Sequence, residues 1–140
     1  MLEGLAVSAI YATCAGTLLA LIRAQVAILY GVAGTPTAGL VEFYCLLSGP
    51  IWLFFGLLLV SNAAFSNLGF PFLATIFNWG RATLGVAPAA LSAAYFKTPE
   101  AAMVGIAFGF AAFGSIATIA CFGCLRSMKW TADIGPNVKM

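Results

Sequence analysis

Polar side chains that could contact a solute stand inside long apolar stretches of this 140-residue chain. Arg81 is the clearest case, and Asn78 precedes it by one helical turn on the same face. A charge or amide at membrane depth is costly unless it is paired or faces water. We therefore expect Asn62, Asn78 and Arg81 to face a cavity. Tyr44 and Trp79 are candidate aromatic contacts for an amphiphilic solute, although aromatics in membrane spans also serve as lipid contacts.

Arg81 has no obvious carboxylate partner in the sequence. The four acidic residues all stand near the ends of apolar stretches; they are Glu3, Glu42, Glu100 and Asp133. Three surroundings would satisfy a guanidinium at that depth: a water-filled cavity, backbone carbonyls, or a residue of another polypeptide segment. The sequence leaves these three open.

Arg23 and Glu42 flank one predicted loop. Along a helix, Arg23 would lie about 12 Å from Gly31 and Glu42 about 8 Å from Pro36, on antiparallel neighbours. These depths are similar enough for the two side chains to meet. We predict a structural ion pair, with contact to a solute as the alternative.

Metal, redox and enzymatic chemistry are not expected. The chain has no His, and its cysteines are Cys14, Cys45, Cys121 and Cys124. The last two form a CxxC, but a closed zinc site needs four ligands and the other two are far away in sequence. The cysteines are therefore predicted to be small buried residues. No phosphate-binding loop, nucleophile elbow or carboxylate pair is present, so we predict no enzyme activity and no cofactor.

Composition indicates that the elements carrying these residues lie in a membrane. Hydrophobic residues make up 63% of the chain and charged residues 7%, against about a quarter charged in soluble domains. With only six cations and four anions, nucleic-acid binding through a basic surface is not expected either. The lipid bilayer is the predicted partner.

The uncharged stretch from Phe43 to Gly80 must fold back on itself. As one helix it would extend roughly 57 Å, nearly twice the ~30 Å hydrocarbon thickness of a bilayer. Asn67, Gly69 and Pro71 provide a turn, because Gly closes a helix and Pro suits the first turn of the next.

These signals predict an all-α integral membrane fold with four helices in an antiparallel up-down arrangement. Thr35 with Pro36, and Thr98 with Pro99, read as helix starts. The expected four-helix region covers residues 1–126, and the expected cytoplasmic tail covers residues 127–140. The predicted spans are residues 5–30, 40–65, 71–95 and 101–125.

Orientation follows from the basic residues. Arg126 stands at the start of the tail and Lys129 and Lys139 within it, whereas the only Lys or Arg in the loops at the other end is Lys97. Cytoplasmic ends carry the excess of Lys and Arg. Both termini and the Asn67 turn are therefore predicted to be cytoplasmic, in an inner or plasma membrane.

Small residues and prolines indicate how the spans pack. Gly105 and Gly109 form a GxxxG, which suits close approach of two helices but is also ordinary membrane-helix composition. Pro50 and Pro88 fall inside predicted spans, where each removes a hydrogen bond and is expected to kink its helix.

The order of residues from Glu42 onward resembles a known family. EFYCLLSGPIWLFFGLLLVSNAAFSNLGFPFLATIFNWGRATLGVAPAALSAAY, followed by EAAMVGIAFGFAAFGSIATIACF, is similar to the C-terminal part of the multidrug and toxic compound extrusion (MATE) transporters. The first span would match the preceding helix. The matching positions are Tyr44, Asn62, Asn67, Gly69, Pro71, Asn78, Arg81, Pro88 and Gly105.

The resemblance implies the last four helices of a twelve-helix antiporter that exports organic cations or other amphiphiles in exchange for Na⁺ or H⁺. The remaining helices of the transporter, or another membrane subunit, would then be partners. Residues 43–65 contain no carboxylate, so this part is not expected to bind the coupling ion itself. The alternative is a stand-alone four-helix membrane protein that acts as a subunit, an assembly factor or a dimeric small exporter.

Overall fold

The computed structural model describes residues 2–133, with side chains to residue 127, and its regular elements in that range are all α-helices. Three of them are long and apolar enough to cross a membrane: α1 (Leu2–Leu21), α3 (Pro36–Asn67) and α6 (Pro99–Asp133). This confirms the expectation of an all-α membrane protein. Residues 134–140 of the predicted tail lie outside the described range.

The first predicted span, residues 5–30, is two helices. α1 ends at Leu21 and α2 (Arg23–Leu29) follows after a single intervening residue, Ile22. Two glycines with positive φ, Gly31 at 68° and Gly34 at 78°, then carry the chain to α3. Thr35 occupies the predicted N-cap position of α3, but its side chain does not cap the helix. Its hydroxyl donates instead to the Val32 carbonyl at 2.7 Å.

The turn after α3 depends on Gly69. Its φ of 83° is a conformation that favours glycine, and it lets the Phe70 amide donate back to the Phe65 carbonyl at 2.8 Å. α3 ends at Asn67, and Pro71 opens the next helix. Of the three residues predicted for the turn, Asn67 and Pro71 therefore stand at its two ends and Gly69 takes its left-handed position.

The third predicted span, residues 71–95, is interrupted. It consists of α4 (Pro71–Thr83) and α5 (Ala87–Phe96), separated by residues 84–86. The Gly85 amide reaches back five residues to the Gly80 carbonyl, and the Ala87 amide only three to that of Leu84. Pro88 follows at once and has no N–H to restore the regular ladder. Pro50, in contrast, stands inside α3, which continues through it.

The fourth predicted span, residues 101–125, lies within the longer helix α6. The Ala101 amide donates to the Thr98 hydroxyl at 3.4 Å, as expected of an N-cap. At its other end α6 continues past Leu125 to Asp133 because residues 126–133 include no Gly or Pro to stop it.

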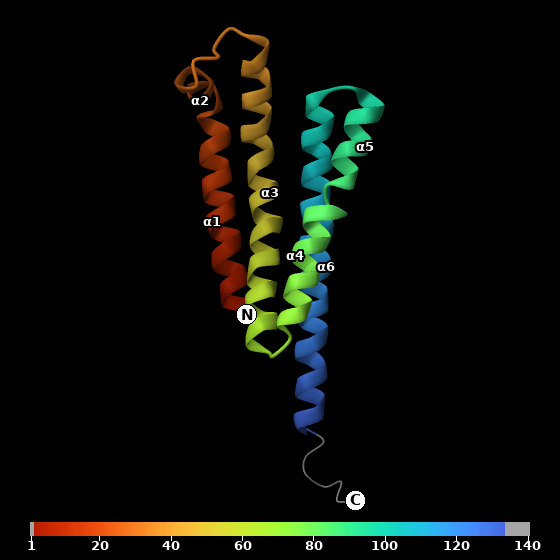
Figure 1. Cartoon of the computed structure of the whole chain (residues 1–140). Helices are drawn as coiled ribbons and strands as arrows, with labels where there is room; N and C mark the ends of the chain where they lie inside the picture. Colours follow the sequence, from red (N-terminus) through yellow and green to blue (C-terminus); the bar gives the residue numbers. More distant parts are fainter. Residues whose placement is uncertain (1, 134–140) are drawn as a thin grey trace, which may run out of the picture.

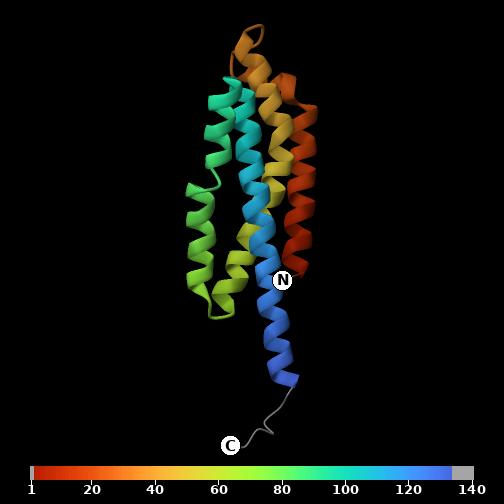
Figure 2. The ribbon, with the colours of Figure 1, turned by 90° about the vertical axis from the view of Figure 1, so that its right-hand side faces the viewer.

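The helices form one elongated bundle with α3 and α6 at its centre (Figure 1). α1 lies along α3, α5 lies along α6 at the far end, and α4 follows the 68–70 turn and packs mainly against α3. Figure 2 shows the interruption between α4 and α5 about halfway along the bundle. α3 and α6 meet closely, since a Cβ on Gly114 would lie within 3.1 Å of the Phe54 carbonyl carbon.

Candidate functional site

Asn62 on α3 and Asn78 on α4 are joined by a hydrogen bond. The Asn62 side chain is 8% exposed, and its Nδ2 donates to Asn78 Oδ1 at 3.1 Å. The buried Oδ1 of Asn62 has no hydrogen-bond partner among the described residues. Leaving such an acceptor unsatisfied costs about 1–3 kcal/mol, so this atom is suited to accept a hydrogen bond from a bound molecule or water.

A second polar contact joins α3 to α6. Ser61 Oγ and Thr118 Oγ1 lie 3.2 Å apart, and Thr118 also donates to the Gly114 carbonyl at 2.8 Å. The sequence prediction missed both residues. Ser and Thr commonly form hydrogen bonds between membrane helices, but the apolar pattern of the sequence does not indicate which Ser or Thr residues face a neighbouring helix.

Arg81 lies against a pair of phenylalanine rings. Its Cζ atom is 5.5 Å from the ring centroid of Phe55 on α3 and 5.0 Å from that of Phe110 on α6. The two rings themselves pack edge to face at 5.6 Å. Cation–π contact thus stabilises the guanidinium, a surrounding that the sequence prediction did not consider.

The aromatic contacts do not satisfy every donor of Arg81. Its Nε is buried without a hydrogen-bond partner, and within the described part of the chain the guanidinium forms no ion pair. Arg81 also stands one turn before the α4–α5 interruption. A donor without a partner therefore lies next to irregular backbone in the middle of the bundle.

The interruption is packed against the GxxxG of α6. A Cβ on Gly109 would lie 2.7 Å from the Gly85 carbonyl carbon and closer still to its oxygen, and one on Gly105 would lie 2.5 Å from Ala89 Cα. The predicted small-residue interface therefore joins α6 to α5 and to the segment that precedes it. These contacts bring the backbone at Gly85 into the buried part of the molecule.

Neither of the predicted aromatic contacts, Tyr44 and Trp79, packs with Asn62, Asn78 and Arg81. Tyr44 stands 18 residues before Asn62 on α3, or about 27 Å along the helix axis. Trp79 is 68% exposed, on the outside of α4. Tyr44 therefore cannot contact a solute held near Asn62, because the two positions are far apart on one long helix, and the Trp79 ring points away from the bundle.

Arg23 and Glu42 are brought together at the far end of the bundle. Arg23 Nε lies 3.8 Å from Glu42 Oε2, and the two side chains are 47% and 41% exposed. Such a half-exposed pair contributes about 1 kcal/mol or less to stability.

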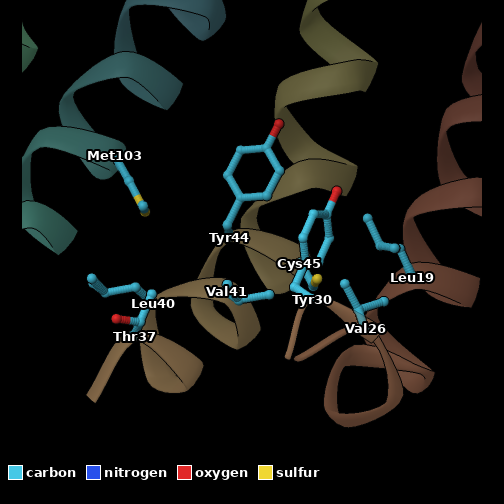
Figure 3. Close-up of a pocket in the computed structure, with 9 residues that line it drawn as sticks. All are labelled: Leu19, Val26, Tyr30, Thr37, Leu40, Val41, Tyr44, Cys45 and Met103. Carbon is cyan, nitrogen blue, oxygen red and sulfur yellow. The ribbon is translucent and has the colours of Figure 1, made fainter. Parts of the chain in front are cut away.

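Tyr44 lines a separate pocket of about 450 Å³ near this ion pair. Figure 3 shows side chains from α1, α2, α3 and α6 around it. The prediction that the cysteines are buried holds for Cys45 and Cys121, whereas Cys124 is half-buried and Cys14 is exposed. No group of three His, Cys, Asp or Glu side chains in the described part of the chain could hold a metal ion.

Comparison of the chain with protein families, curated proteins and solved structures finds no match.

Proposed function

We propose that α4 and α5 together form a fourth membrane crossing. α4 is about 20 Å long and α5 about 15 Å, so in series they match the ~30 Å hydrocarbon thickness. Irregular backbone at membrane depth is tolerated where protein buries it or where it lines a water-filled cavity. The packing of Gly85 against Gly109 meets the first condition.

The function that these features support best is solute export, as part of a MATE-like multidrug efflux antiporter driven by Na⁺ or H⁺. Arg81 is the observation that carries the proposal: a buried Nε without a partner, beside an interrupted helix in mid-bundle. Interrupted membrane helices commonly form solute sites in transporters. In this proposal the remaining helices of the transporter supply the coupling carboxylates, and both termini face the cytoplasm of an inner or plasma membrane.

The surroundings of Arg81 suit an amphiphilic solute. Phe55 and Phe110 offer aromatic surface, and the unpartnered Asn62 Oδ1 can accept a hydrogen bond from an amine or hydroxyl. In the proposed mechanism the solute displaces water from these groups, and its hydrogen bonds satisfy atoms that the protein alone leaves unpaired.

An efflux assay tests this proposal. Cells that express the chain from its native genomic context, with any neighbouring membrane segments, are loaded with the cationic dye ethidium and their efflux rate is measured. Arg81→Ala is expected to slow energised efflux by about tenfold or more, since a hydrogen bond to a charged group contributes about 1.5–3 kcal/mol.

Arg126→Ala is the matched control, because Arg126 is an exposed cation near the end of α6 and is expected to leave efflux unchanged. Equal efflux by Arg81→Ala and wild type, at equal protein levels in the membrane, would remove Arg81 from the solute site.

A further inference from the structure

The pocket at the far end of the bundle has the dimensions of a ligand site. Its volume is about 450 Å³, within the range of small-molecule sites. Its walls are mostly apolar, and the side chains that form them are Leu19, Val26, Tyr30, Thr37, Leu40, Val41, Tyr44, Cys45 and Met103. Figure 3 shows Tyr30 and Tyr44 among these residues.

The pocket is open to the surroundings of the bundle. Cys45 on its wall is 2% exposed, whereas Tyr44 is 47% and Tyr30 is 73% exposed. α1 and α3, which contribute Leu19 and Tyr44, are long and apolar enough to cross a membrane. An opening between two such helices is one that the hydrocarbon chains of a lipid could enter from the bilayer.

Both signs of charge stand beside this opening. Arg23 and Val26 of α2 and its C-cap residue Tyr30 are spaced by three and four residues, so all three lie on one face of that helix. Glu42 of α3 contacts Arg23 and is thereby held near the same face, although neither charged side chain lines the pocket itself. The single Arg23–Glu42 contact, at 3.8 Å between half-exposed side chains, leaves guanidinium N–H groups and a carboxylate oxygen available to a ligand.

We propose that this pocket binds a phospholipid whose headgroup carries both a phosphate and a protonated amine. One acyl chain fills the apolar pocket, the phosphate accepts hydrogen bonds from Arg23, and the ammonium group donates to Glu42. A purely anionic headgroup would meet repulsion from Glu42, and a cationic amphiphile would meet it from Arg23. The zwitterion complements both charges, and this site is independent of the proposed solute site at Arg81.

The acyl-chain part of the proposal is tested by filling the pocket. The full chain is reconstituted in equal parts phosphatidylethanolamine and phosphatidylglycerol, extracted in detergent, and its retained lipids are counted by native mass spectrometry. Val41→Phe is expected to reduce retained phosphatidylethanolamine by about tenfold, because a few excluded methylene groups contribute about 0.8 kcal/mol each. Val60→Phe, on the same helix at a different cavity, is the matched control and is expected to retain lipid as the wild type does.

The headgroup part is tested by neutralising each charge. Arg23→Gln is expected to reduce retained phosphatidylethanolamine about threefold. Glu42→Gln leaves Arg23 alone at the opening and is expected to shift the preference toward phosphatidylglycerol by a similar factor. Equal retention of both lipids by wild type and both charge variants would overturn the zwitterion assignment. Unchanged retention in Val41→Phe, or equal loss in Val60→Phe, would overturn the site.

Discussion

Gly109→Val is expected to lower the free energy of unfolding by about 3 kcal/mol, as overpacking of a tight contact does. The added side chain would collide with the Gly85 carbonyl, which is backbone and cannot rotate away as a side chain can. α6 would have to separate from the α4–α5 interruption, and the contact of Gly105 with Ala89 would loosen with it. The measurement is unfolding of the purified chain by SDS, followed by circular dichroism.

Gly123→Val provides the matched control. Gly123 stands on the same helix, and a Cβ placed there would meet nothing within 4 Å. The two variants share the same intrinsic change in helix propensity, so their difference isolates the contact with Gly85. Equal unfolding midpoints for the two variants would show that Gly109 does not pack against the interruption.

Phe110→Ala is the second substitution with a large expected effect. Truncating a packed phenylalanine costs about 3–5 kcal/mol, and here it also removes the closer of the two rings that contact Arg81. A double-mutant cycle with Arg81→Met isolates the cation–π contribution to the free energy of unfolding. In the Arg81→Met background, Phe110→Ala is expected to cost about 1–2 kcal/mol less than in the wild type. SDS unfolding of the four proteins gives the coupling energy.

Asn78→Ala is the control for this cycle, because Asn78 lies one turn from Arg81 but bonds to Asn62. Its combination with Phe110→Ala should be additive. A coupling energy near zero between Arg81 and Phe110 would mean that the guanidinium is stabilised by some other group.

Local signals in the sequence were sufficient for much of the fold. Composition and the long uncharged stretch predicted apolar helices, and Gly69 with Pro71 marked the turn because left-handed backbone and helix starts have strong residue preferences. The Arg23–Glu42 contact was also predictable, since both residues flank the same short loop at similar depth.

Tertiary contacts explain what the sequence did not predict. Pro88 indicated a disturbance in the third span, but the interruption lies at residues 84–86, where Gly85 packs against Gly109 of a different helix. The partners of Arg81 were missed for the same reason. Phe55 and Phe110 come from α3 and α6, and no periodicity in the sequence distinguishes them from other phenylalanines in those helices.

The central claim is that α4 and α5 act as one crossing, which places the Asn67 turn and the start of α6 on opposite sides of the membrane. Single cysteines are introduced as Asn67→Cys or Glu100→Cys, both at exposed positions, in a chain whose four native cysteines are replaced by Ala. A membrane-impermeant maleimide is then applied to intact and to permeabilised cells.

The account predicts that Glu100→Cys reacts in intact cells, whereas Asn67→Cys reacts only after permeabilisation. Reaction of both cysteines from the same side would contradict it, because α4 and α5 would then enter and leave the membrane on one face.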